Sequence, residues 1–340
     1  MAVGLAELFP RLGLPVVFLP TEVRLTKPDE ESVHHRWDHL AATNCNLTAE
    51  EWLPRVSHVV WFDIQPRKLE AARRAGKKNI LVLLWHRLAA EDLPFLSWFD
   101  RIVCPSRACA AWLRGIQPLV SAACIPWDGG LPLAARLHSP FHPQERRLLV
   151  YLDGPSADAC ATGVLGVIFA LLRADSRVKV AICRAASWPR DAKPLARGLL
   201  ADYPQRFMDM LRMCFLERAD ACRVHDWVWC PACKDNAGAH LLEGLSHGRP
   251  VIGFDALPAS EIVTDGLNGR LVPCRVNCNA MGAPLVVFDQ AQAQQAVFDA
   301  LLGASFVAVQ QHEWTDLEQR KRNFQDAWKR LLLSEDDMEQ

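Results

Sequence analysis

Two carboxylates eight positions apart, Asp235 and Glu243, are the residues of this chain with the clearest chemical use. The small and apolar residues around Glu243 predict a helix that begins at Gly238, and Asp235 precedes it in a loop. The backbone amides of Asn236, Ala237 and Gly238 would open this helix, where unpaired N–H groups favour phosphate oxygens. A carboxylate beside them can accept two hydrogen bonds from a vicinal diol. The spacing favours a site for a sugar and a nucleotide, and two stray charges on a surface helix are the alternative.

Alternating strands and helices must position these residues. The chain has 340 residues, more than one hydrophobic core usually supports, so we expect two domains. Apolar runs predict strands at 14–20, 57–62, 79–85, 101–104, 122–126, 147–152, 178–183, 226–230 and 250–254. Helices are predicted at 4–12, 66–76, 106–114, 163–174, 203–215, 238–247 and 313–333. This alternation is typical of an α/β fold with doubly wound parallel sheets.

The periodicity fades between residues 131 and 147, where three prolines predict a linker. Two Rossmann-like halves with a cleft between them follow from this pattern. Ligands of such sheets bind beyond the carboxyl ends of the strands. A Rossmann dehydrogenase is disfavoured, because no Gly-x-Gly-x-x-Gly follows an early strand.

Composition and charge exclude several classes of protein. The 38 basic and 39 acidic residues nearly cancel, so no global attraction to nucleic acid or anionic membrane is indicated. Apolar runs are far shorter than the ~20 residues that span a bilayer. The first residues lack the basic start and apolar core of a signal peptide, so we expect a cytoplasmic protein with reduced cysteines.

The segment from Asp235 to Val272, DNAGAHLLEGLSHGRPVIGFDALPASEIVTDGLNGRLV, resembles the donor-site signature of retaining GT-B glycosyltransferases, glycosyltransferase family 4. Members carry an acid, seven residues and a glutamate, then a Gly-x-Pro-Val-Ile strand and an Asp-Gly-x-Asn-Gly turn. Other segments that match the family are FDRIVCPSRACAAWL (99–113), ACIPWDGG (123–130), HDWVWCPA (225–232) and HEWTDLEQRKRNFQDAW (312–328). The resemblance implies a GT-B fold, in which two Rossmann-like domains face each other across a cleft.

The same resemblance implies three parts of the chain. Residues 1–135 would form the acceptor-side domain and residues 136–312 the domain that binds the nucleotide sugar. Residues 313–340 would form a helix that crosses back to the first domain. The implied reaction is hexosyl transfer from a nucleotide-diphosphate sugar, with a UDP-sugar expected, with retained configuration and without metal or other cofactor.

The resemblance also assigns roles to single residues. Asp235 would hold hydroxyls of the donor sugar and Glu243 the ribose of the nucleotide. His86 follows the predicted strand 79–85 and would meet the donor sugar from the opposite domain. Pro231 would line the donor site, and the helix amides would bind the diphosphate.

Three departures from the family pattern affect these roles. The first acid is Asp235 rather than glutamate, which is one methylene longer. The family has a Gly-Arg…Lys-Gly segment that grips the diphosphate, but DGPSADACATG (153–163) contains no Arg or Lys. Arg184 or Lys234 could supply the missing charge; otherwise the chain could be a catalytically silent GT-B-like protein that binds nucleotide or glycan. The family's first strand and glycine loop have no counterpart, which leaves the acceptor side undefined.

Two further clusters have open interpretations. Cys230 with Cys233, and Cys274 with Cys278, could supply four thiolates to zinc or could simply pack, and HHRWDH (34–39) could bind a metal or form a solvated loop.

The basic segment PRKLEAARRAGKK (66–78) predicts a helix with Arg67, Arg74 and Lys78 on one face. This face could be solvated, or it could meet an anionic acceptor, either lipid head groups at a membrane surface or DNA, as in phage-type glucosylation of hydroxymethylated bases. A glycan acceptor also stays open.

Overall fold

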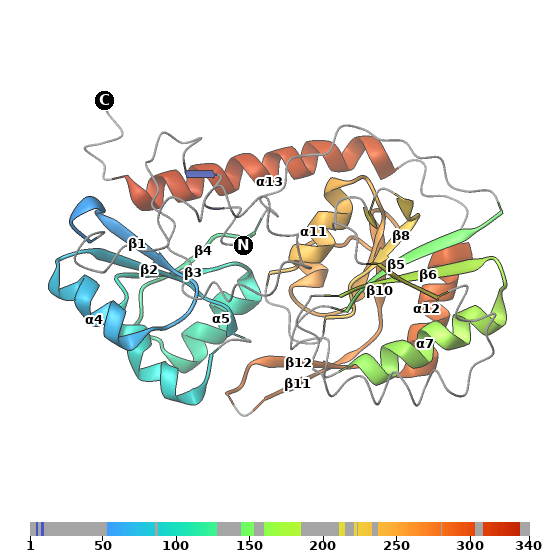
Figure 1. Ribbon diagram of the computed structural model, residues 1–340, viewed down its shortest axis with the longest axis horizontal. Helices are drawn as coiled ribbons and strands as arrows, with labels where there is room; N and C mark the ends of the chain where they lie inside the picture. Colours follow the sequence, from blue (N-terminus) through green and yellow to red (C-terminus); the bar gives the residue numbers. More distant parts are fainter. Residues whose placement is uncertain are drawn as a thin grey trace, which may run out of the picture. The chain divides into compact units, whose positions relative to one another are not determined.

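The computed structural model describes residues 5, 8–9, 53–85, 88–127, 144–152, 160–184, 211–214, 221–222, 224–232, 237–279, 281–302 and 309–333. Its contacts divide the chain into two compact units, residues 1–130 with 319–340, and residues 131–318. The long helix α13 (Val309–Leu332) begins in the second unit and ends in the first (Figure 1). The functional domains expected at 1–135, 136–312 and 313–340 stay predictions.

The first unit contains a parallel sheet of four strands in the order β1-β2-β3-β4. Its strands are β1 (His58–Trp61), β2 (Lys78–Val82), β3 (Arg101–Cys104) and β4 (Ala122–Cys124). The helices α4 (Pro66–Arg74) and α5 (Arg107–Ile116) connect neighbouring strands and lie on the same side of the sheet, as right-handed crossovers in one direction require (Figure 1). Short 3₁₀ helices are η2 (Leu53–Arg55) and η4 (Ala90–Trp98).

Aromatic packing joins the end of α13 to this unit. The ring of Phe324 lies 5.1 Å from that of Trp127, edge to face. Trp328 is 1 % exposed and its ring lies 5.4 Å from that of Phe9. These contacts bury the apolar stripe of an otherwise charged helix, which explains its place in the first unit.

The second unit contains a six-stranded sheet in the order β10-β9-β8-β5-β6-β7, and all its pairs are parallel. Its strands are β5 (Arg146–Leu152), β6 (Val178–Arg184), β7 (Leu211–Cys214), β8 (Trp227–Trp229), β9 (Val251–Phe254) and β10 (Gly269–Val272). From β5 the chain builds outward to β7, then returns to the other side of β5 and builds outward again from β8. This is the strand order of dinucleotide-binding Rossmann sheets.

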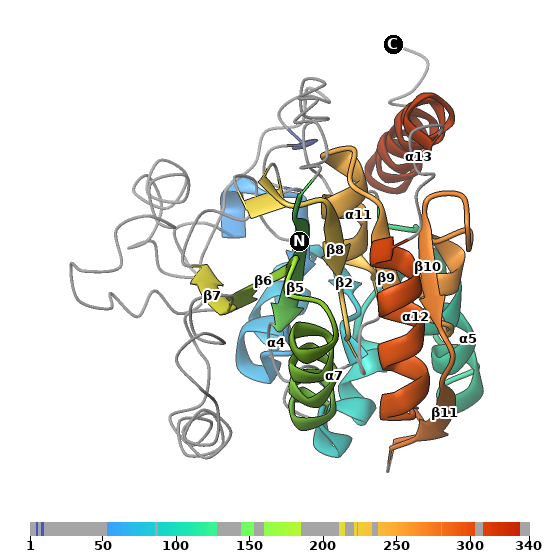
Figure 2. The same ribbon diagram turned by 90° about the vertical axis from the view of Figure 1, so that its right-hand side faces the viewer.

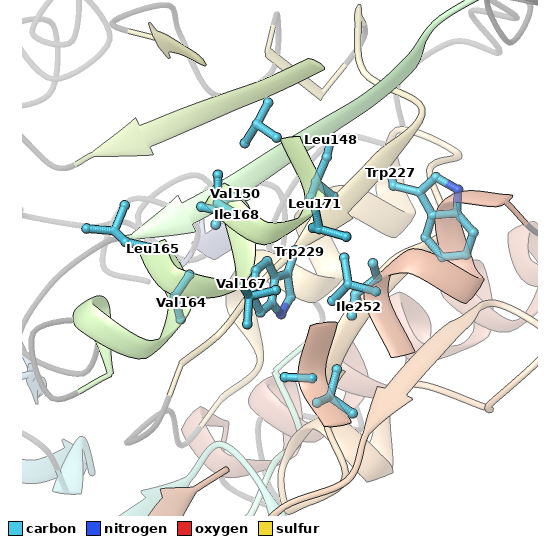
Figure 3. Close-up of a cluster of buried hydrophobic side chains, with 14 of the residues drawn as sticks. Leu148, Val150, Val164, Leu165, Val167, Ile168, Leu171, Trp227, Trp229 and Ile252 are labelled. Atoms are coloured by element: carbon cyan, nitrogen blue, oxygen red, sulfur yellow. The ribbon is translucent and has the colours of Figure 1, made fainter. Parts of the chain in front are cut away.

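The helices α7 (Ala161–Ala174) and α12 (Gln290–Leu302) lie side by side on one face of this sheet (Figure 2). Alternate strand residues such as Val150, Trp229 and Ile252 point into the core beneath these helices (Figure 3). The helix α11 (Ala239–Ser246) packs against β8 and β9. Its Gly244 lies against Val228 and Val251, whose side chains alternate with those of the core, so α11 covers the opposite face.

Two smaller elements complete the described part of this unit. The strands β11 (Arg275–Cys278) and β12 (Pro284–Val287) form an antiparallel hairpin, and η5 (Ala259–Glu261) follows β9. The predicted α/β class with parallel sheets is therefore confirmed, and most predicted elements agree with the observed ones to within a few residues.

The predicted helix 203–215 is wrong in its described part, residues 211–214. Residues 211–214 belong to the strand β7 and not to a helix, because Leu211 to Cys214 pair in register with Val180 to Cys183 of β6. Helix propensity in a Leu- and Met-containing segment is weak and yields to such pairing. The elements α12, η4 and β10 to β12 were not predicted. The predicted helix at 4–12 and strand at 14–20 lie outside the described residues, apart from Leu5, Leu8 and Phe9, which are helical.

Candidate functional site

The candidate site lies where the strand order of the second sheet reverses, between β5 and β8. Val150 of β5 pairs with Trp229 of β8, and the chain leaves these two strands at the same edge of the sheet. Cys160 occupies the N-cap position of α7, and its thiol donates a buried hydrogen bond of 2.9 Å to the Pro231 carbonyl after β8. The two connections that diverge at the reversal are therefore tied together. Ligands of open α/β sheets bind at such reversals.

Gly238 shapes the start of α11 beside this point. Its φ of +65° is left-handed, and a Cβ atom there would lie 2.1 Å from Cδ1 of Ile262. Glycine is therefore favoured by the left-handed backbone conformation, and the end of the Ile262 side chain occupies the space of a Cβ atom. Ala237 before it is 3 % exposed. The chain can enter α11 in this tight geometry only with small residues at both positions.

Glu243 is buried on α11, with a relative exposure of 7 %. Its Oε2 atom lies 3.5 Å from Nδ1 of His240, one turn earlier on the same helix. A buried carboxylate requires polar partners, since desolvation penalises an isolated charge. The acid that the family pattern singles out is thus held in the middle of α11, beside a histidine that sequence reasoning did not consider.

His240 is braced in turn by β5. Its ring stacks on that of Tyr151 with centroids 4.7 Å apart and an interplanar angle of 9°. The Tyr151 hydroxyl lies 3.2 Å from Sγ of Cys222, and Tyr151 is 2 % exposed. The spacing of the acid pair could not reveal this contact, because Tyr151 and His240 lie far apart in the sequence.

A second polar cluster holds the opposite, amino-terminal edge of the sheet. The Arg147 amide donates to the Asp226 carboxylate at 2.9 Å, and Nε of Arg249 donates to the Cys222 carbonyl at 3.1 Å. Burial raises the pKa of Asp226, while the Arg147 amide and the charge of Arg249 oppose this rise. Burial lowers the pKa of Arg249, because it disfavours the charged form of that group as well. Because Arg249 precedes β9, it belongs to this edge and not to the reversal site.

The described residues include only part of the predicted site. Pro231, Ala237, Gly238 and Glu243 lie at the reversal or on the helix that follows it. His86, Lys234, Asp235 and Asn236 lie outside the described residues. Arg184 ends β6 in register with Leu152, the last residue of β5, so its backbone stands at the same edge of the sheet.

The Asp-Gly-x-Asn-Gly turn of the family pattern has a purely structural explanation. Asp265 accepts from the Leu271 amide at 2.8 Å, and the Asn268 side chain accepts from the Thr264 amide and donates to the Ile262 carbonyl. A Cβ atom on Gly269 would lie 2.1 Å from the Val251 carbonyl oxygen. This part of the motif therefore builds the turn into β10.

The cysteine clusters show no metal site among the residues that the structure describes, which hold no group of three or more His, Cys, Asp or Glu side chains suited to a metal ion. Cys233 is not one of the described residues. Burial, with a smaller contribution from Asp255, raises the pKa of Cys274 to about 11. HHRWDH (34–39) lies outside the described residues.

The basic segment 66–78 forms a shorter helix than predicted. α4 ends at Arg74, and Lys78 begins β2, so the predicted helical face of Arg67, Arg74 and Lys78 is wrong. Glycine at 76 stops the helix with a left-handed φ of +67°. Arg67 and Arg74 are both exposed, and Arg74 forms an ion pair with Glu70. The guanidinium of Arg73 lies 5.2 Å from the ring centroid of Trp98.

Among the described helices, none is long and apolar enough to cross a membrane.

Comparisons with known proteins show the fold of this chain. No family model and no curated protein sequence matches it. The pneumococcal O-GlcNAc transferase GtfA, solved with UDP and GlcNAc, matches with a TM-score of 0.59 and 13 % identity over 81 % of this chain and 56 % of GtfA. The α,α-trehalose 6-phosphate synthase from Burkholderia multivorans matches with a TM-score of 0.56 and 11 % identity over 86 % and 74 % of the two chains.

A third structure, TarM from S. aureus in complex with fondaparinux, α-GlcNAc-glycerol and UDP, matches with a TM-score of 0.55 and 12 % identity over 78 % and 53 % of the chains. The first matched structures are longer proteins, of which this chain spans about half, 56 % for GtfA. At these identities the likeness concerns architecture alone. The chain has the fold of GT-B glycosyltransferases.

Proposed function

We propose that this protein is a retaining, metal-independent glycosyltransferase that uses a nucleotide-diphosphate sugar, with a UDP-sugar as the expected donor. The observation that carries this proposal is the position of buried Glu243 on α11, the helix that follows β8 at the reversal of strand order. Nucleotides bind at this place in Rossmann sheets. The GT-B fold and the matched structures solved with UDP support the same donor class.

In this proposal each part of the site has one task. Glu243 accepts hydrogen bonds from the ribose hydroxyls, and Asp235 holds hydroxyls of the donor sugar. The amides of Asn236, Ala237 and Gly238, at the positive end of α11, bind the diphosphate. His86 meets the donor sugar, and Pro231 lines the site.

The leaving diphosphate also needs positive charge, because developing charge in a transition state must be compensated. The segment 153–163 supplies none, as it lacks Arg and Lys. We assign this task to Arg184, whose backbone stands beside the end of β5, with Lys234 as the second candidate. The acceptor then attacks the anomeric carbon from the face that the diphosphate leaves, so the configuration is retained.

The direct test is binding of nucleotides and nucleotide sugars. Wild-type protein should show a raised thermal midpoint with one nucleoside diphosphate and its sugars, because a ligand that binds only the folded state stabilises it. Incubation with EDTA should leave transfer unchanged. A loss of activity that zinc restores would instead favour the cysteine cluster.

A catalytically silent GT-B-like protein that binds nucleotide or glycan is the second candidate. The absence of Arg and Lys from segment 153–163 favours it. Under this alternative the protein binds a nucleotide sugar but neither transfers nor hydrolyses it. Single-turnover incubation with labelled donor, followed by separation of donor, free sugar and nucleotide, distinguishes the two candidates.

The acceptor side of the proposal rests on α4. Arg67, Lys68, Arg73 and Arg74 are all exposed on this helix or its flanks, and only Glu70 is acidic. Such a surface attracts phosphates of lipid head groups or of DNA. We propose an anionic acceptor for this reason; an uncharged glycan acceptor remains the alternative.

A further inference from the structure

His240 lies between Tyr151 and Glu243, and the proposed function gives it no task. His240 is the second residue of α11, and its Nδ1 atom faces Oε2 of Glu243 at 3.5 Å. The imidazole ring of His240 lies flat against the ring of Tyr151. A histidine held by stacking and aimed at a carboxylate is arranged to control the direction of that carboxylate.

Tyr151, on which His240 stacks, is held firmly by the sheet. Tyr151 is the penultimate residue of β5, a central strand that pairs with β6 on one side and β8 on the other. The tyrosine ring is buried and its hydroxyl meets Cys222. Stacking of aromatic rings favours a fixed relative orientation of the two planes. The plane of the imidazole is therefore set by the sheet and not only by α11.

The chemistry of the contact determines where the proton lies. An unprotonated Nδ1 would turn its lone pair toward a carboxylate oxygen, so the stable arrangement carries the proton on Nδ1. At 3.5 Å the contact is longer than the 2.7–3.2 Å of ordinary N–H···O bonds, so it acts mainly through electrostatic attraction. It holds Oε2 on the histidine side of α11 and restricts rotation of the glutamate side chain.

We propose that His240, braced on Tyr151, is a positioning residue that orients Glu243 for the ribose of the donor nucleotide. This inference rests on the proposed function, in which Glu243 binds that ribose. A vicinal diol needs both carboxylate oxygens in a defined plane, and a freely rotating glutamate would lose that freedom on binding. Preorganisation by His240 removes part of this loss.

The test uses nucleotide binding to the full chain, measured by isothermal titration calorimetry with UDP, ADP and GDP and the 2′-deoxy form of each. His240→Phe keeps a ring on Tyr151 but removes the N–H donor. It should weaken binding of the ribonucleotide about ten-fold, because the Glu243 carboxylate then loses the electrostatic contact that restricts its rotation before binding. It should leave the 2′-deoxynucleotide, which already lacks one ribose contact, nearly unchanged.

Two further variants separate positioning from folding. His240→Asn places an N–H donor near the former Nδ1 but lacks the ring that stacks on Tyr151, so it should restore only part of the ribonucleotide affinity. In a Glu243→Gln background, His240→Phe should have no further effect, because residues that act through each other are not additive. Equal weakening of ribo- and deoxynucleotide by His240→Phe, or full additivity with Glu243→Gln, would overturn the positioning role.

The failures of the two proposals are distinguishable. If wild-type protein binds none of the three nucleoside diphosphates, the proposed function fails and this inference fails with it. If wild type binds one of them and His240→Phe binds it equally well, only the inference fails. Should His240→Phe not fold, Tyr151→Leu removes the brace instead and must produce the same selective loss of ribonucleotide affinity.

Discussion

The thiol of Cys160 and the carbonyl of Pro231 form a hydrogen bond of 2.9 Å that joins the beginning of α7 to the segment after β8. Both residues are buried. The bond therefore closes the reversal point of the second sheet, from which the two connections otherwise diverge.

Cys160→Ala should lower the free energy of unfolding by about 1–3 kcal/mol, because it leaves the Pro231 carbonyl buried without this donor. Cys160→Ser keeps a donor and should recover part of the loss. Urea unfolding followed by tryptophan fluorescence measures both. A Cys160→Ala protein as stable as wild type would show that this bond contributes nothing.

Replacing Glu243 and replacing Asp235 should impair different properties of the protein. Glu243→Ala should abolish nucleotide binding, since the ribose contact is shared by all donors and their product. Asp235→Ala should retain nucleoside diphosphate binding and lose transfer, since its contact is to the sugar. Asp299→Ala, an exposed acid on α12 at the other face of the sheet, is the control for loss of charge. Equal loss of both properties in Asp235→Ala would contradict its sugar role.

Reversing charge on α4 should weaken binding to an anionic acceptor without affecting the donor. Arg67→Glu with Lys68→Glu should reduce co-sedimentation with phosphatidylglycerol vesicles at least ten-fold, since each basic residue near such a surface contributes about 1 kcal/mol. The pair Arg107→Glu and Arg114→Glu on α5 makes the same change in net charge and is the control.

A DNA duplex is the other probe for this surface. The logarithm of its binding constant should fall linearly with the logarithm of salt concentration, which identifies phosphate contacts. If wild type at low salt binds neither vesicles nor DNA, the α4 surface is a solvated face and the anionic acceptor is wrong.

Asp226 should make stability depend on pH. Burial raises its pKa above the ordinary value of about 4, so the folded state binds the proton more tightly than the unfolded state. This contribution is fully present below the ordinary pKa and is lost as pH rises through the raised one. Asp226→Asn keeps an acceptor for the Arg147 amide but cannot ionise. As the pH rises from mildly acid to neutral, the free energy of unfolding of wild type should therefore fall relative to that of Asp226→Asn.

Urea unfolding of both proteins across this range provides the difference, in which the other titrating groups largely cancel. A difference that instead grows in favour of wild type as pH rises would mean that attraction to Arg249 outweighs the cost of burial.

Gly269 should tolerate no side chain. Gly269→Ala places Cβ 2.1 Å from the Val251 carbonyl oxygen in the neighbouring strand. Separating β9 from β10 should cost about 1–3 kcal/mol or more. Gly115 on α5 is the matched control, because a Cβ there meets nothing within 4 Å and alanine favours a helix. Thermal unfolding should show a lowered midpoint for Gly269→Ala and an unchanged or raised one for Gly115→Ala.

Local patterns in the sequence were sufficient for the fold class and for much of the second unit. Apolar runs such as residues 147–152 and 250–254 become the buried strands β5 and β9, since a strand covered on both faces needs apolar residues at successive positions. The helix after Gly238 was equally predictable. Glycine and small residues before an apolar segment are a local signal for a helix start.

Other features depended on contacts between distant segments. The strand β7 exists because residues 211–214 pair with β6. The helix α12 packs on α7, and its buried residues recur at helical spacing, a local signal that the sequence analysis missed. The reversal between β5 and β8 depends on the order in which strands add to the sheet, which periodicity does not encode.

The acid pair illustrates the same division. The small and apolar residues around Glu243 were sufficient to predict that it lies on a helix that begins near Gly238. That Glu243 is buried against His240, and that His240 stacks on Tyr151, was decided only by the tertiary structure. Side chains from β5 and α11 meet when the sheet and its covering helix pack together, and no spacing along the chain specifies that contact.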